Sequence, residues 1–165
     1  MSAIGIFKVS YLDACAAVKL VIRERGFDDP NTYFTNHSFS ITSFCLFEAF
    51  DVLKRKMCKT KISRDEYFYA CYMIAYLQGK RIRIDDEPEI DSIATFIRAQ
   101  KFAQDHDLDL SDALQLLSVK HGRFCKLAKE PKTILITSDK ALAKAAKSED
   151  LRVWNCEKKS EPPDC

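Results

Sequence analysis

The chain has 165 residues, of which 47% are hydrophobic and 30% charged, with a net charge of +2. This balance is typical of one globular domain. No apolar run approaches the ~20 residues that a membrane span needs, so we expect no membrane-spanning helix. Because the net charge is small, any basic surface must be confined to one part of the molecule. The start of the chain lacks the pattern of a signal peptide, so we expect a cytoplasmic protein. The seven cysteines form no CxxC pair and are odd in number, which predicts free thiols rather than zinc ligands or disulfides.

The first predicted elements are a short strand that ends at Leu12 and a helix from about Ala14 to Gly26, with Asp13 between them. A turn-rich segment and a strand at 38–42 follow. A helix over 43–59 comes next, with Leu46, Phe47, Phe50, Leu53 and Met57 on its predicted inward face.

The middle of the chain predicts an aromatic helix from about Ser63 to Gly79, which begins with a Ser63–Glu66 capping box. Its rings indicate either core packing or cover by another chain. A strand is predicted at 81–87. Pro88 then opens a predicted helix whose inward residues are Ile90, Ile93, Ala94 and Ile97.

The last part of the chain predicts a helix from Leu110 to Gly122, a fully covered parallel strand at 134–137, a helix that starts at Asp139 and a final strand at 151–155. Strands thus alternate with helices. This predicts an α/β fold, with a mostly parallel sheet of four or five strands between two layers of helices. One domain over 1–156 is expected, with a disordered tail over 157–165.

Three of the acidic residues share one context, because Asp13, Asp112 and Asp139 each lie at the start of a predicted helix. Aspartate is a preferred N-cap, so helix capping is the common alternative to a functional role. Asp109 competes with Asp112 for the cap of its helix. Glu48 lies in the middle of its helix and cannot cap it; a solvated position or an ion pair with Arg55 is its alternative role.

If these four carboxylates converge, their repulsion requires a cation. Two unit charges ~4 Å apart repel by about 4 kcal/mol at an effective dielectric constant near 20. Oxygen ligands of this kind suit Mg²⁺ or Mn²⁺.

Four segments, in order, resemble the PIN-domain ribonucleases, and in particular the toxin subunits of VapBC toxin–antitoxin systems. They are YLDACAAVKL, ITSFCLFEAFDVLKRK, LDLSDALQLLSVKHG and ILITSDKALAKAA. The resemblance implies a PIN-like α/β/α sandwich and Mg²⁺- or Mn²⁺-dependent endonucleolytic cleavage of RNA. It also implies homodimerisation and a cognate antitoxin as partner. The implied catalytic and metal-binding residues are Asp13, Glu48, Asp112 and Asp139.

The same resemblance implies a hydroxyl beside the last aspartate, which is Thr137 or Ser138 here. The chain departs from the family pattern at Cys15, where Ser or Asn is common, and a thiol is the weaker hydrogen-bonding group. The RNA backbone needs basic partners near the acidic residues. The candidates are Lys19, Arg23, Arg55 and Lys59, each of which could equally be an ordinary solvated charge.

Two other functions fit the same residues. A PIN-like module without catalytic activity would bind a partner through this region. A DNA nuclease of related chemistry would use the same carboxylates on a different nucleic acid.

Overall fold

The computed structural model describes residues 9–22, 39–86, 89–122 and 133–156. Its centre is a five-stranded sheet in which every neighbouring pair of strands is parallel. The strand order is β3-β2-β1-β4-β5. The strands are β1 (Val9–Leu12), β2 (Phe39–Ile41), β3 (Ile82–Ile84), β4 (Thr133–Thr137) and β5 (Arg152–Asn155). The predicted parallel sheet is therefore confirmed.

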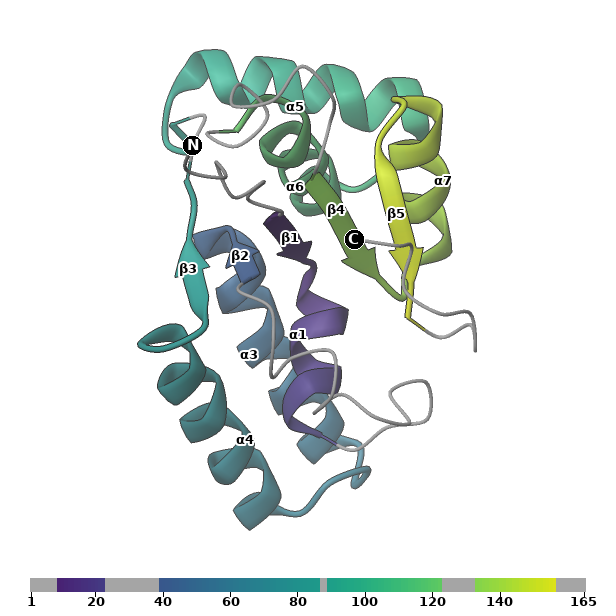
Figure 1. The fold of residues 1–165 in the computed structure, drawn as a ribbon. Helices are drawn as coiled ribbons and strands as arrows, with labels where there is room; N and C mark the ends of the chain where they lie inside the picture. The colour runs from purple at the N-terminus through teal and green to yellow at the C-terminus, as the bar shows by residue number, and fades with distance from the viewer. Residues whose placement is uncertain (1–8, 23–38, 87–88, 123–132, 157–165) are drawn as a thin grey trace, which may run out of the picture.

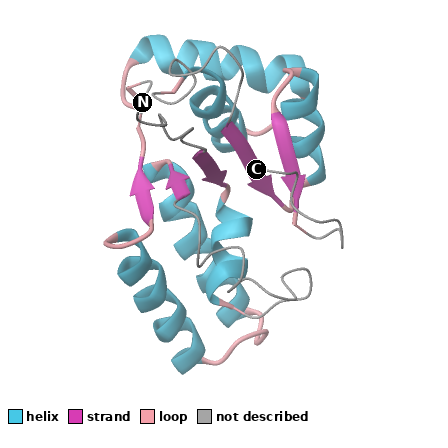
Figure 2. Cartoon of the chain, viewed as in Figure 1, coloured by secondary structure: helices cyan, strands magenta, loops and turns pink. Residues whose placement is uncertain are grey.

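Helices cover both faces of the sheet and complete a three-layer α/β/α sandwich (Figures 1 and 2). One layer holds α1 (Ala14–Val21), α3 (Ser43–Cys58) and α4 (Arg64–Gln78), which contact one another. The other holds α5 (Ile93–His106), α6 (Leu110–His121) and α7 (Lys140–Ser148), in which α6 contacts both neighbours.

Successive strand residues point to opposite faces, as the pleat requires. Leu12 and Ile136 pack with α1 and α3, whereas Tyr11 and Leu135 pack with α6 and α7. The central strands β2 and β4 are buried along their whole length, as expected of covered parallel strands, whereas the edge strand β3 exposes Arg83 and Ile84.

Two helix ends differ from the sequence prediction. Helix α1 ends at Val21 and its C-cap Ile22 is extended, so the predicted extension to Gly26 is wrong. The β-branched pair Val21–Ile22 favours such extended backbone. Helix α5 begins at Ile93 rather than at Pro88, because Ser92 is its N-cap and accepts from the Thr95 N–H. Residues 23–26, Pro88 and the predicted tail lie outside the described residues.

Two predicted inward faces are also wrong in part. On α5, Ile93 is 79% exposed and Ile97 63% exposed, while the buried residues are Thr95 and Ala99. Small side chains at the contact let α5 approach α6 closely, and this outweighs the pull of the larger isoleucines toward the core. On α3, Leu53 is fully buried as predicted, but Phe47 is 70% exposed.

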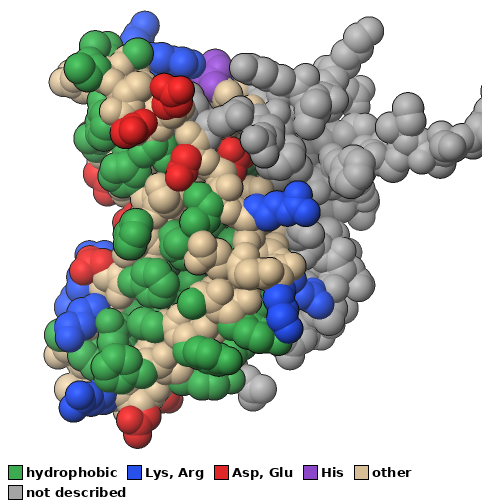
Figure 3. All heavy atoms as spheres, turned by 90° about the vertical axis from the view of Figure 1, so that its left-hand side faces the viewer, with side chains coloured by type: hydrophobic (Ala, Val, Ile, Leu, Met, Phe, Trp, Pro, Cys, Tyr) green, Lys and Arg blue, Asp and Glu red, His purple; other side chains and the backbone are tan. Residues whose placement is uncertain are grey.

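Helix α4 begins with the predicted capping box between Ser63 and Glu66 and ends at Gln78, before Gly79. Its buried residues are only Ala70 and Ile74. Most of its rings are exposed: Phe68, Tyr69, Tyr72 and Tyr76. Figure 3 shows hydrophobic side chains gathered over the lower part of this face, where α4 lies. Of the two predicted roles for these rings, exposure excludes packing of all of them in this chain's core.

None of the described helices is both long enough and apolar enough to cross a membrane. The described cysteines Cys15, Cys45, Cys58, Cys71 and Cys156 are all free, as predicted.

Candidate active site

Strand order places two aspartates side by side at the centre of the sheet. From β1 the chain moves outward through β2 to β3, and then returns to β4 on the other side of β1. Such a switch point leaves a crevice at the carboxyl ends of the two strands, where ligands of open parallel sheets bind. Asp13 directly follows β1, and Asp139 follows β4 after one residue. The Asp13 N–H donates to the Ile136 carbonyl at 3.1 Å, so the two strand ends are in register there.

Asp13 is buried and caps α1, since its Oδ1 accepts from the Ala16 N–H at 2.5 Å. Its Oδ2 accepts from the hydroxyl of Thr137. Burial raises the pKa of Asp13 to about 6 against the opposing effect of these two bonds, and the charges of Asp139 and Glu48 raise it further. Capping of α1 by Oδ1 therefore leaves Oδ2 to contact Thr137.

Thr137 joins the two aspartates. It donates its hydroxyl proton to Asp13 and accepts from the Asp139 N–H at 2.9 Å. Asp139 in turn caps α7, where its Oδ1 accepts from the Leu142 N–H at 2.8 Å. Thr137 thus orients the carboxylate of Asp13 and holds the backbone at Asp139, while Ser138 hydrogen-bonds to the Cys15 side chain.

Cys15 lies beside this pair and is half-buried. Burial raises the pKa of its thiol to about 12, and the charges of Asp13, Glu48 and Asp139 add to the effect. The group therefore stays a protonated thiol at neutral pH, which disfavours nucleophilic or redox chemistry there.

Glu48 reaches the same region from α3. Its Oε2 accepts from the Ser111 hydroxyl at 2.8 Å, which connects α3 to the first turn of α6. The alternative ion pair of Glu48 with Arg55 does not occur, because Arg55 pairs with Asp51 at 3.0 Å.

Asp112 lies in the first turn of α6, which Asp109 caps by accepting the Asp112 N–H at 2.9 Å. Burial raises the pKa of Asp112 to about 7, and the charges of Asp109, Asp139, Glu48 and Asp13 contribute in that order. Asp112 thus lies within electrostatic reach of the other three sequence-predicted carboxylates, and so does Asp13.

Gln115 is the main residue of this region that the sequence did not reveal. It is fully buried one turn after Asp112, and its Nε2 donates to the Leu12 carbonyl at 3.0 Å. Its Oε1 accepts from the Thr42 hydroxyl at 3.1 Å and from the Cys45 thiol at 3.0 Å. Gln115 therefore connects the end of β1, the start of α3 and α6.

The sequence feature that could have identified Gln115 is a single amide side chain on an otherwise apolar helix face. Ser111, which orients Glu48, had no comparable signal, because serine in a first turn is common.

The donor set suits a hard divalent cation, since it consists of carboxylate oxygens, and burial followed by mutual repulsion raises the pKa values of Asp13 and Asp112. Among the described residues, no three His, Cys, Asp or Glu side chains are grouped closely enough to hold a metal ion. Shared ligation by Asp13, Glu48, Asp112 and Asp139 therefore requires side-chain movement toward the ion.

The residues predicted to contact the RNA backbone differ in exposure and in their distance from the carboxylates. Lys19 is buried in α1 and is not an open contact for phosphate. Arg55 and Lys59 are exposed, but they lie seven and eleven residues beyond Glu48, which is roughly 10 and 16 Å along the helix. Arg23 lies outside the described residues.

No family model matches the chain, and no curated protein matches it. Among solved structures it is similar to the crystal structure of PAE2754 from Pyrobaculum aerophilum, with 14% sequence identity over 84% of each chain and a TM-score of 0.53. At this identity the similarity concerns the fold alone, and it agrees with the three-layer α/β/α architecture.

Proposed function

We propose that this protein is a metal-dependent endoribonuclease that hydrolyses RNA phosphodiester bonds with Mg²⁺ or Mn²⁺. The observation that carries the proposal is that Asp13 and Asp112 each lie within electrostatic reach of the other predicted carboxylates at the switch point of a parallel sheet. The resemblance of the four sequence segments to PIN-domain toxins supports the same activity.

The four carboxylates would hold the cation. Once bound, the ion supplies Lewis-acid stabilisation of the charge that develops on a phosphodiester and activation of water for attack. The chain itself contributes orientation: Thr137 sets the direction of the Asp13 carboxylate, the Leu142 N–H that of Asp139, and Ser111 that of Glu48. Because the pKa of Asp112 is raised to about 7 in the metal-free protein, binding of a cation there would release a proton near neutral pH.

The test is cleavage of single-stranded RNA by Asp13→Asn protein in Mg²⁺ and in Mn²⁺. Asparagine can still cap α1, so the variant is expected to fold and to lose activity roughly 100-fold or more. Asp51→Asn is the control, because Asp51 is an exposed carboxylate on α3 that pairs only with Arg55 among the described residues. A folded Asp13→Asn protein that cuts RNA like the wild type would refute the proposal.

Substrate comparison separates the remaining alternatives. Cleavage of single-stranded DNA in preference to RNA identifies a DNA nuclease. A wild-type protein that cleaves neither and gains no stability from Mn²⁺ is a binding module without catalytic activity.

We further propose that the partners are a second copy of this chain and a cognate antitoxin, in the cytoplasm. The exposed rings on α4 support a protein partner, because apolar surface of this extent is unusual on a monomer. The free cysteines agree with a reducing compartment.

A further inference from the structure

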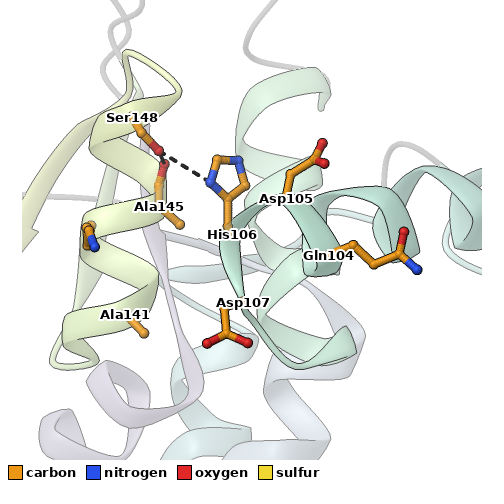
Figure 4. Close-up of a pocket in the computed structure, with 8 residues that line it drawn as sticks. Gln104, Asp105, His106, Asp107, Ala141, Ala145 and Ser148 are labelled. Carbon is orange, nitrogen blue, oxygen red and sulfur yellow. Dashed lines mark hydrogen bonds between the residues drawn. The ribbon is translucent and has the colours of Figure 1, made fainter.

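A cavity of 410 Å³ opens between the C-terminal part of α5 and the exposed side of α7 (Figure 4). Its volume falls in the range of small-ligand sites. Gln104, Asp105, His106 and Asp107 line it from α5 and its end, and Lys144 and Ser148 are among those that line it from α7. The four carboxylates of the candidate active site are not part of its lining.

The cavity is nevertheless adjacent to those carboxylates. Figure 4 shows Asp107 and Ala141 at one end of the cavity and Ser148 at the other. Ala141 is two residues after Asp139, and Asp107 is two residues before Asp109, which caps the helix of Asp112. From Asp139 to Lys144 the helix rises roughly 8 Å. In the proposed ribonuclease, an RNA strand with its phosphate at the carboxylates would therefore reach the cavity with a neighbouring nucleotide.

The cavity lining combines carboxylate acceptors from Asp105 and Asp107, the ammonium group of Lys144 and the ring of His106. The carboxylates of Asp105 and Asp107 have no hydrogen-bond or ion-pair partner among the described residues. The His106 ring is held by Glu149, whose Oε1 lies 2.7 Å from Nε2, and by Phe102, whose ring centroid is 5.8 Å away. Asp107 has a φ of 53°, the left-handed region that non-glycine residues seldom adopt. Asp107 is the C-cap of α5, a position at which left-handed backbone is common.

We propose that this cavity binds a guanine base of the RNA strand, next to the phosphodiester that is cut; the inference rests on the proposed ribonuclease function. Guanine presents two adjacent N–H donors, N1–H and the N2 amino group, which match one carboxylate. Its O6 and N7 acceptors match the ammonium group of Lys144. Uracil has no amino group, and the carboxylates disfavour phosphate in the cavity. His106 provides a flat ring for stacking.

The experiment is an NMR titration of the full chain with guanosine, inosine and uridine monophosphates, following the backbone signals of Ala141 and Ala145. Inosine monophosphate differs from guanosine monophosphate only by lack of the N2 amino group. We expect guanosine monophosphate to bind about tenfold more tightly than inosine monophosphate. Asp107→Asn should remove that difference, because asparagine tolerates the left-handed backbone but does not accept both donors.

Asp150→Asn is the matched control, since Asp150 is also a left-handed aspartate after a helix and does not line the cavity. It should bind guanosine monophosphate like the wild type. Equal binding of guanosine and inosine monophosphates, or an unchanged preference in Asp107→Asn, would overturn the inference. Cleavage of RNA is scored separately: a protein that binds guanine but cuts no RNA refutes the ribonuclease alone. One that cuts RNA without this preference refutes the guanine site alone.

Discussion

At the scale of single residues, the candidate active site consists of side chains that serve two purposes. Asp13 and Asp139 cap α1 and α7, and Thr137 contacts the carboxylate of Asp13 and the backbone N–H of Asp139. A capping oxygen keeps a second lone pair, so satisfaction of the helix N–H leaves room for a further partner. The charged forms of these carboxylates are destabilised, because burial and mutual repulsion raise the pKa values of Asp13 and Asp112.

This destabilisation predicts that Asp112→Asn stabilises the metal-free protein at pH 8. The pKa of Asp112 is raised from 3.8 to about 7, so the folded state binds more protons than the unfolded state between these values. Stability from this group therefore falls as pH rises through that window. After allowance for solvent screening of a partly exposed group, we expect a gain of about 1–2 kcal/mol in the free energy of unfolding at pH 8.

Urea unfolding of both proteins in EDTA, at pH 4 and pH 8, measures this difference. It should be present at pH 8 and much smaller at pH 4, where the carboxyl is protonated in the folded protein and about two-fifths protonated in the unfolded one. A variant that is less stable than the wild type at pH 8 would contradict the prediction.

At the scale of elements, helices α3, α4 and α5 each expose large apolar side chains that the sequence alone assigns to the core or leaves ambiguous. Ile93 on α5 and Phe47 on α3 were predicted to point inward and instead face outward. Periodicity identifies an apolar stripe but does not reveal which part of a wide stripe meets the sheet. A protein partner would cover the exposed apolar side chains on α4.

The face of α3 can be tested with two substitutions. Phe47→Ser should change the free energy of unfolding of the monomer by no more than about 0.5 kcal/mol, because the ring is exposed. Leu53→Ala should cost about 2–5 kcal/mol, because Leu53 is fully buried. Urea denaturation at low protein concentration compares them. Similar losses in the two variants would mean that Phe47 is packed after all.

At the scale of the whole molecule, one amide joins the parts that carry the carboxylates. Gln115 on α6 contacts the residue before Asp13 and both Thr42 and Cys45 at the start of α3. It thereby relates the positions of Asp13, Glu48 and Asp112, which come from three separate elements. Side-chain networks of this kind specify a unique arrangement when every member is satisfied.

Gln115→Met should therefore weaken Mn²⁺ binding about tenfold or more, as changes to residues that orient metal ligands do. It should also cost about 2 kcal/mol of stability through lost hydrogen bonds. Mn²⁺ affinity is measured by electron paramagnetic resonance, well below the unfolding temperature. Leu117→Ala is the control, since Leu117 is fully buried on the same helix and belongs to the core. If both variants bind Mn²⁺ equally well, Gln115 serves stability alone.

The sequence by itself determined the alternation of strands and helices, the parallel sheet and the four acidic positions. Local rules account for this: buried parallel strands are short apolar runs, and an aspartate after a strand caps the next helix. Asp13, Asp112 and Asp139 could be chosen as candidates on that basis, and Glu48 because it could not cap a helix.

Only the tertiary structure decided how these residues meet. The strand order, which returns to β4 beside β1, places Asp139 next to Asp13 across more than a hundred residues of chain. The roles of Thr137, Ser111 and Gln115 likewise depend on contacts between distant elements. Hydrogen bonds over such separations leave no periodic pattern in the sequence, because their partners are neighbours in space alone.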